Sequence, residues 1–434
     1  MSVTFDEDRL VPNAGLVVPA VLVQRLDVAG LVNRRVRLDR ERPGAANSGA
    51  KAVTVLGGML AGADSIDDLD VLRAGAAPVL FDDMRAPSTI GTWLRAFKWS
   101  NVREFDAVTR QVLGRAWRAG LGPADLAAPM TIDIDSSICQ TYGVAKQGGR
   151  FGYTKVRGYH PLLATIAGTS EVAHSRLRGG NAGSARGAKS FTAETLSRVR
   201  DAGATGELTV RADSAFYSRG FVAACRAADA RFSVTVRMNT AIRAAIAAIP
   251  DTAWTPIPYW LEGGADVAEV PYTAFKSARR DAMDLRLIVR RVRPTPGSQL
   301  ALDIVFDHHA LVTDRTGATL EIEADHRAHA RVELVIRDLK DNALAHLPSG
   351  RFPANAAWLA LAVLAHNLGR WTLTAAGPDF VDATVGTLRR KLIVMPARLV
   401  TSARRLRLRA PTGWPWADAL TDALTAIRAI PAPG

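Results

Sequence analysis

The spacing of apolar residues changes several times along the chain, and each change predicts a different kind of element. Between residues 51 and 118 apolar side chains recur every three or four positions, as in helices that bury one face. At Met130 the period falls to two, so that Ile132 and Ile134 face one side of a strand while Asp133 and Asp135 face the other. We therefore expect a helical N-terminal region that leads into a core built on a β-sheet.

The predicted core alternates between strands and helices. Apolar and β-branched runs predict strands at 159–168 and 171–180, and helical spacing returns at 192–203. A strand at 207–216, a second helix and a strand at 231–238 complete the order three strands, helix, strand, helix, strand. This order predicts an α/β core in which ligand-binding groups gather at strand ends.

Two segments depart from this alternation. From about residue 239 to 318 only short alternating strands are evident, which predicts a β-rich insertion in the core. The Gly-rich segment 178–190 lacks the spacing of a phosphate-binding loop, because an alanine separates Gly187 from Lys189. We expect a flexible basic loop there.

A helix after the insertion, HRAHARVELVIRDLK, is amphipathic. Its apolar stripe consists of Val332, Val335, Ile336 and Leu339. Its polar stripe consists of His326, His329, Glu333, Arg337 and Lys340. One carboxylate among basic side chains fits either an exposed face with ordinary ion pairs or a metal ligand flanked by phosphate-binding cations.

The composition favours a folded protein with a polyanionic partner. The 434 residues are 48% apolar and 22% charged, which is typical of a chain with a well-buried core. Lys and Arg number 55 against 42 Asp and Glu, so the net charge is +13 and the pI is near 10.3. This balance favours nucleic acid as a partner.

The cysteine count, the N-terminal stretch and the lengths of the apolar runs give further expectations. The chain has only two cysteines, too few for a disulfide framework or a cysteine zinc site. The N-terminal stretch MSVTFDEDRL does not resemble a signal segment, and no apolar run is long enough to span a membrane. We expect a cytoplasmic protein.

The pattern divides the chain into five regions. The first is basic and helical, and the last contains a basic hairpin in which Arg405, Arg407 and Arg409 share one strand face. Both ends are therefore suited to contacts with a phosphate backbone. The regions are an N-terminal helical DNA-binding region at 1–128, the first part of the core at 129–238, the insertion at 239–318, the second part of the core with the glutamate helix at 319–375, and a basic C-terminal region at 376–434.

Three carboxylates of the predicted core lie at strand ends or on the helix that follows the last strand. Asp135 ends the first strand, Asp213 ends the fourth, and Glu333 lies on the helix after the fifth. Oxygen ligands of this kind suit Mg²⁺ or Mn²⁺, and two such ions about 4 Å apart can clamp the attacking and leaving oxygens of phosphoryl transfer. The order matches the ribonuclease H-like fold of nucleic-acid phosphoryl transferases. Asp133 is a rival for the position of Asp135.

Several motifs together resemble one family. The segments DIDSS, TYG, FGYTKVRGYHPLLA and VRADSAFYS, with the helix that carries Glu333 and Lys340, resemble bacterial insertion-sequence transposases with an Asp-Asp-Glu site. The most similar group is insertion-sequence family thirteen-eighty, within the cut-and-paste group that bears a Tyr-Arg-Glu-Lys signature. MLAGADSIDDLD and APSTIGTWLRAF are also similar to that family, so the resemblance covers most of residues 50 to 400.

The resemblance implies a site and a reaction. Asp135, Asp213 and Glu333 would be catalytic and hold two Mg²⁺ or Mn²⁺ ions, with Lys340 seven residues after the glutamate. Water would cut at the transposon end, and the freed 3′-hydroxyl would form a hairpin on the opposite strand. The opened end would then join target DNA, in a homodimer on paired terminal repeats.

The resemblance also implies residues that contact DNA. The signature's Tyr and Arg positions fall on His326 and His329, which departs from the family pattern, and Arg327 and Arg331 lie alongside. A flipped base would stack on an aromatic of the insertion. The candidates for that role are Trp254 and Trp260.

Two other functions remain open. A DNA-binding relic that has lost catalysis would explain the altered Tyr and Arg positions while keeping the fold. A zinc hydrolase would use histidines, of which the candidates are His308, His309, His326 and His329. Adjacent histidines on a strand face opposite ways, which weakens this second alternative.

Overall fold

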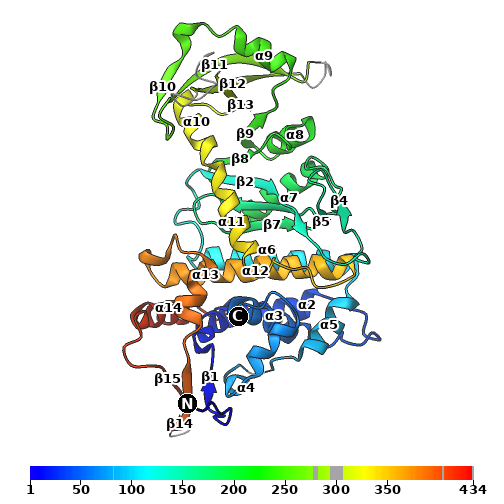
Figure 1. Cartoon of the computed structure of the whole chain (residues 1–434), viewed down its shortest axis with the longest axis vertical. Helices are drawn as coiled ribbons and strands as arrows, with labels where there is room; N and C mark the ends of the chain where they lie inside the picture. Colours follow the sequence, from blue (N-terminus) through cyan, green and yellow to red (C-terminus); the bar gives the residue numbers. More distant parts are fainter. Residues whose placement is uncertain (82, 277–281, 294–305, 403–404, 433–434) are drawn as a thin grey trace.

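The protein, described in a computed structural model, is arranged in tiers along its long axis. The structure describes residues 1–81, 83–276, 282–293, 306–402 and 405–432. Figure 1 shows a β-rich tier at one end, a sheet flanked by helices in the middle and a helical tier that contains both chain ends. The helix pair coloured yellow, α10 and α11, runs from the first tier into the second.

A nine-stranded mixed sheet connects the β-rich tier with the middle tier. Its order is β10-β11-β12-β13-β9-β8-β2-β6-β7. The strands of the middle tier are β2 (Met130–Ser136), β6 (Leu162–Ile166), β7 (Val172–Arg176), β8 (Leu208–Ala212) and β9 (Ala230–Val236). The strands of the β-rich tier are β10 (Thr255–Ile257), β11 (Ala265–Ala274), β12 (Met283–Val292) and β13 (Asp307–Thr313).

The five strands expected in the core are present in the expected order. β2, β6 and β7 form an antiparallel meander, while β8 and β9 run parallel to β2. The strands of the expected insertion continue the same sheet, because β13 pairs antiparallel with β9. We expected β2 to have one buried face, but Asp133 is also buried, since β2 lies in the middle of the sheet with elements on both faces.

Helices flank the sheet and fix the direction of its strands. After β7 comes α7 (Ala188–Ala202), and α8 (Arg219–Ala227) connects β8 with β9. The Ser218 hydroxyl caps α8 by accepting a hydrogen bond from the backbone amide of Phe221. In the β-rich tier, α9 (Thr240–Ala247) and the 3₁₀ turn Asp251–Ala253 precede β10.

The predicted glutamate helix is divided by a 3₁₀ turn. We expected one continuous helix from His326 to Lys340. Arg211 donates hydrogen bonds to the backbone carbonyl and the carboxylate of Asp325, and the same carbonyl accepts from the Ala328 amide three residues later, as in a 3₁₀ turn. The resulting elements are α10 (Thr319–Arg327), the turn Ala328–Ala330 and α11 (Arg331–Lys340).

The long helix α12 (Phe352–Ala375) separates the middle tier from the helical tier (Figure 1). It is apolar on nearly all sides because it contacts the sheet through β7 and the N-terminal helices through α3, α5 and α6. The Asn367 side chain accepts from the Val172 amide at 2.8 Å and donates to the Val172 carbonyl at 2.9 Å. This pairing covers part of the exposed edge of β7.

The helical tier combines both ends of the chain. Its N-terminal helices are α1 (Val17–Arg25), α2 (Val28–Arg35), α3 (Ser48–Ala61), α4 (Ala77–Leu80), α5 (Pro87–Ala96) and α6 (Trp99–Arg118), with 3₁₀ turns at Ala14–Leu16 and Asp67–Arg73. The C-terminal part contains a 3₁₀ turn (Pro378–Phe380), α13 (Val385–Leu388), a π-helical turn (Arg389–Ile393), β14 (Ala397–Ser402), β15 (Arg405–Arg409) and α14 (Ala417–Ala429). The short β1 (Leu10–Val11) pairs with β14, so the two ends share one small sheet.

Local sequence signals account for the C-terminal hairpin and for two helix starts. The hairpin is confirmed, with β14 and β15 antiparallel. In the N-terminal region, α5 begins at Pro87 and α6 at Trp99. Proline favours the first helical position, and the Asn101 side chain accepts from the Lys98 amide from inside the first turn.

Within the described residues, no single helix is long and apolar enough to cross a membrane. Only the bent pair Ala14–Arg25 and Val28–Arg35, whose halves meet at 50°, passes that test by length and composition.

Candidate active site

Asp135 and Asp213 lie side by side at the carboxyl ends of two adjacent parallel strands. β2 and β8 pair in register up to Ile134 and Ala212, so each aspartate is the next residue on its strand. Neighbouring strands are about 4.8 Å apart, which brings these two side chains within reach of a shared ligand. Backbone amides hold both carboxylates, since Asp135 accepts from Ser136 at 2.6 Å and Asp213 from Ala215 at 3.0 Å.

Glu333 approaches the same place from α11. Val332, Val335, Ile336 and Leu339 bury the apolar stripe of this helix, which contacts β2. His329 bonds Asp133 at 2.8 Å, and one helical turn carries the chain about 6 Å further to Glu333. Two residues of β2 cover a similar distance, from Asp133 to Asp135.

The charges at this place act on one another. Burial raises the pKa of Asp135 to about 6, and the negative charges of Asp213 and Glu333 contribute to the increase. A hydrogen bond from Ser136 and the charge of His329 oppose it. Three mutually repelling carboxylates with only oxygen donors are a set that fits a hard divalent cation.

Asp133 has a different environment from Asp135. Its carboxylate is 1% exposed and accepts from Arg211 at 2.7 and 2.8 Å and from His329 at 2.8 Å. Burial opposes its ionisation, but the hydrogen bonds from His329 and Arg211 outweigh burial, so the pKa of Asp133 lies below its ordinary value. With its oxygens occupied by side chains of the protein, Asp133 serves as an anchor for the turn between α10 and α11.

The two histidines at the signature positions, His326 and His329, make hydrogen bonds within the protein. His326 lies between two hydroxyls of β9, with Ser233 Oγ 2.6 Å from Nδ1 and Thr235 Oγ1 2.9 Å from Nε2. Burial and the positive charges of His329 and Arg211 lower the pKa of His326 to about 3, so the ring is neutral at physiological pH. The Nδ1 proton of His329 is donated to Asp133.

The comparison with known families decides the identity. The family model described as Transposase DDE domain group 1 matches residues 1–432. The chain belongs to this family of DDE transposases. No curated protein matches the transposase. Six chains of solved structures match it, among them one from the cryo-EM structure of the piggyBac transposase synaptic complex with hairpin DNA, with a TM-score of 0.42 and 12% identity over 87% of this chain and 77% of that chain.

The remaining residues expected to contact DNA are dispersed over the transposase. Arg331 is exposed at the start of α11, and Arg327 pairs with Glu323 at 3.3 Å. The charge of Lys340 acts on the Cys139 thiol, whose pKa burial raises to about 11. In the β-rich tier, the Trp254 ring lies 4.3 Å from the Arg291 guanidinium, and Trp260 is 80% exposed.

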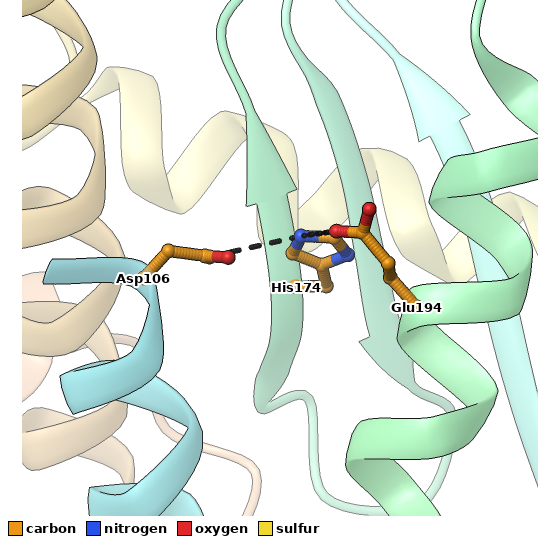
Figure 2. A group of neighbouring side chains, drawn as sticks. All are labelled: Asp106, His174 and Glu194. Carbon is orange, nitrogen blue, oxygen red and sulfur yellow. Dashed lines mark ion pairs between the residues drawn. The ribbon is translucent and has the colours of Figure 1, made fainter. Parts of the chain in front are cut away.

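A second acidic cluster of the transposase was not predicted from the sequence. Figure 2 shows Asp106 of α6 and Glu194 of α7 on either side of His174 of β7. Nε2 of His174 lies 3.7 Å from an oxygen of each carboxylate, as in a site for a metal ion. Ion pairs nevertheless engage both carboxylates with three guanidinium groups, those of Arg103, Arg176 and Arg198.

These arginines decide what the second cluster does. They outnumber its two carboxylates, so an added divalent cation would meet a positive surrounding. Burial and the same three arginines hold the pKa of His174 well below its usual range. The cluster therefore joins α6 to the middle tier through ion pairs. The residues are distant in the sequence, so no spacing pattern pointed to it.

A buried histidine near the acidic site was also missed. His160, fully buried, donates through Nδ1 to the Ala182 carbonyl at 2.7 Å, which leaves Nε2 to accept from the Ser136 hydroxyl at 2.9 Å. This series of hydrogen bonds fixes Ser136, the residue directly after Asp135. Its only signal in the sequence was the segment YHPLLA, which we used for the resemblance and not for a site.

Proposed function

We infer that this transposase cuts DNA at the ends of an insertion sequence and joins them to target DNA, with Asp135, Asp213 and Glu333 holding two Mg²⁺ or Mn²⁺ ions. The observation that carries the proposal is the convergence of three carboxylates from β2, β8 and α11. Burial raises the pKa of Asp135 to about 6, and the negative charges of Asp213 and Glu333 add to the increase. The ions would clamp the attacking and leaving oxygens of each phosphoryl transfer.

The sheet supports a ribonuclease H-like core. Along the chain, β2, β6, β7, β8 and β9 follow one another with the intervening helices that the sequence predicted for such a core, and the acids lie at the ends of its first and fourth strands. We propose that 129–238 and 319–375 form this core. The region 239–318 would then be an insertion that adds β10 to β13 to its edge.

The proposed reaction needs residues that keep the three carboxylates in position. Water attacks the scissile phosphate and releases a 3′-hydroxyl, which then attacks the opposite strand to form a hairpin at the transposon end. Ser136, fixed by His160, keeps its amide directed at Asp135, while the Asp133 and His329 contact keeps Glu333 in place. The chain would work as a homodimer on paired ends.

We propose that Arg331 takes the phosphate-binding role of the signature arginine in insertion-sequence family thirteen-eighty. His329 occupies that position but donates its Nδ1 proton to Asp133. Arg331, two residues before Glu333, is exposed. Lys340 keeps the signature lysine position.

Strand cleavage on linear DNA that carries the element's own ends tests the proposal. The reaction is run with Mg²⁺, with Mn²⁺ and with EDTA, for the wild type, Asp213→Asn and Glu333→Gln. Glu321→Gln, which alters an exposed acid on α10, is the matched control. We expect metal-dependent nicks and hairpins with the wild type and the control alone. Binding without cleavage by the wild type would favour a DNA-binding relic.

A further inference from the structure

We propose that the segment 139–159, which we name the aromatic flap, binds unpaired DNA bases beside the acidic site. This proposal rests on the proposed function, because it assigns a further binding surface to the same DNA. The flap is a small sheet in the order β3-β5-β4 with its connecting loops. Its strands are β3 (Cys139–Gln140), β4 (Arg150–Phe151) and β5 (Arg157–Tyr159).

Three aromatic rings of the flap face solvent. Tyr142, Phe151 and Tyr153 are 69%, 67% and 77% exposed. They are half of the six exposed aromatic side chains among the residues that the structure describes. Exposed aromatic rings that gather in twelve residues are typical of a binding surface, and every nucleobase offers a face on which such a ring can stack.

The flap is connected directly to the acidic site. The Tyr153 ring centre lies 5.9 Å from that of His160, and His160 bonds the Ser136 hydroxyl at 2.9 Å. Ser136 follows Asp135 in β2. The negative charge of Asp213 also acts on His160, since it opposes the decrease that burial causes in the pKa of this ring. Tyr153 therefore lies at the border of the site where DNA would be cut.

The charge of the flap suits the backbone that connects such bases. No acidic residue occurs between Ser136 and Ser170, and the only one from there to Glu194 is Glu171, which is 1% exposed. Arg150 and Lys155 of the flap are exposed. Cations interspersed with aromatic rings form the usual binding surface for single-stranded nucleic acid.

Arginines hold the flap and the neighbouring Gly-rich loop in shape. Arg157 donates to the carbonyls of Gly143, Val144 and Gly149. Arg178 donates to three carbonyls of the loop, those of Gly183 at 2.9 Å, Ser184 at 3.1 Å and Arg186 at 2.8 Å. The loop that we expected to be flexible is thus held by its own arginine, and its Gly180 amide donates to the Gly148 carbonyl of the flap at 3.1 Å. The rings are therefore presented on a preorganised backbone.

The flap and the loop also touch along their backbones. A Cβ atom at Gly180 would lie 2.1 Å from the Gly158 carbonyl oxygen, so a side chain there would separate the two segments. This close approach explains the glycine at position 180.

The same charges argue against a protein partner at this surface. A second copy of the transposase that paired flap to flap would place Arg150 and Lys155 against their own equivalents, and like charges that face each other repel. A nucleic acid instead neutralises these cations with phosphates while its bases cover the rings. Unpaired bases arise at the transposon end when a hairpin forms, which is the step that the proposed function requires.

Binding of a matched pair of DNA ends tests this proposal without catalysis. In EDTA, the wild type is titrated with a fully paired transposon end and with the same end carrying two unpaired bases and 2-aminopurine at one of them. Stacking on an aromatic ring quenches the fluorescence of 2-aminopurine. We expect tighter binding of the unpaired end and quenching by the wild type.

The variants locate the contact. Phe151→Ala with Tyr153→Ala should bind the unpaired end roughly five- to 150-fold more weakly per lost stacked base, while binding of the paired end changes little. Tyr153→Phe, which keeps the ring, should bind like the wild type. Trp260→Ala tests whether the exposed tryptophan of the β-rich tier stacks the bases in place of the flap.

The outcomes separate the two proposals. Equal binding and quenching by the wild type and the double flap variant, or loss only in Trp260→Ala, would overturn the flap proposal. A change in the oligomeric state of the double variant without a change in DNA binding would overturn it in favour of self-association. Failure of the wild type to cut DNA in Mg²⁺ or Mn²⁺ would refute the proposed function, whatever the binding result.

Discussion

Replacement of Arg211 with methionine is the sharpest test of how the site is held together. The change keeps a long apolar side chain and removes the guanidinium that pairs with Asp133 at 2.7 and 2.8 Å. The two side chains are 2% and 1% exposed, so the carboxylate would lose its main partner without gaining water. Loss of one partner of a buried pair costs about 3–5 kcal/mol, so the free energy of unfolding should decrease by that amount.

The pH dependence of this loss follows from Asp133. Its pKa is lowered in the folded state, so the pair stabilises the protein above the pKa of the unfolded carboxyl, about 3.9, and the contribution disappears as the pH falls through the lowered folded value. The difference between wild type and Arg211→Met should therefore be largest near pH 7. If the whole chain unfolds as one unit, its unfolding entropy converts 3–5 kcal/mol to a decrease in Tm of roughly 3–5 °C.

Urea denaturation of four proteins measures the effect. They are the wild type, Arg211→Met, Asp133→Leu and the double variant, which removes both charges. We expect the double variant to regain at least about half of the stability that Arg211→Met loses, because no unpaired charge stays buried. A loss below about 1 kcal/mol in Arg211→Met, or a double variant less stable than either single one, would refute the reasoning.

Three further predictions concern other buried or titrating groups. Glu171→Leu should lower the free energy of unfolding by roughly 2–6 kcal/mol in urea titrations, because the indole donors of Trp117 and Trp371 lose their shared acceptor. Because the folded-state pKa of His326 is depressed to about 3, its contribution to stability should decrease below about pH 6.5, where the unfolded chain takes up a proton; NMR of the ring should show no titration between pH 5 and 8. Mn²⁺ binding, followed by electron paramagnetic resonance, should weaken as the pH falls through about 6, where Asp135 takes up a proton.

The sheet and its acids were predictable because their signals are local. Alternation over a few residues indicated β2 and β8, and Asp135 and Asp213 each follow the last residue at which these two strands pair with each other. The choice between Asp135 and Asp133 was harder to make from the sequence. The Arg211 guanidinium binds the Asp133 carboxylate and so distinguishes it from Asp135, but Arg211 lies 78 residues further along the chain.

The parts that sequence could not predict depend on contacts between distant residues. The 3₁₀ turn before α11 arises where Arg211 takes the carbonyl of Asp325, 114 residues away. His326 looked like part of an exposed polar stripe, but its partners are two hydroxyls of β9. The flap aromatics lie in the segments TYG and FGYTKVRGYHPLLA that carry the resemblance, but their exposure is known only once the chain is folded.

The central claim is that three carboxylates hold the metal ions of the reaction, and a change of ligand atom tests it most directly. Asp135→Cys, Asp213→Cys and Glu333→Cys each replace an oxygen donor with sulfur, which Mg²⁺ binds poorly and Mn²⁺ accepts more readily. Glu321→Cys, at an exposed acid of α10, is the matched control. DNA cleavage is measured for each variant in Mg²⁺ and in Mn²⁺. We predict that the three variants lose cleavage in Mg²⁺ and regain part of it in Mn²⁺, while the control shows no such metal preference. Undiminished Mg²⁺-dependent cleavage by the three variants would contradict the account.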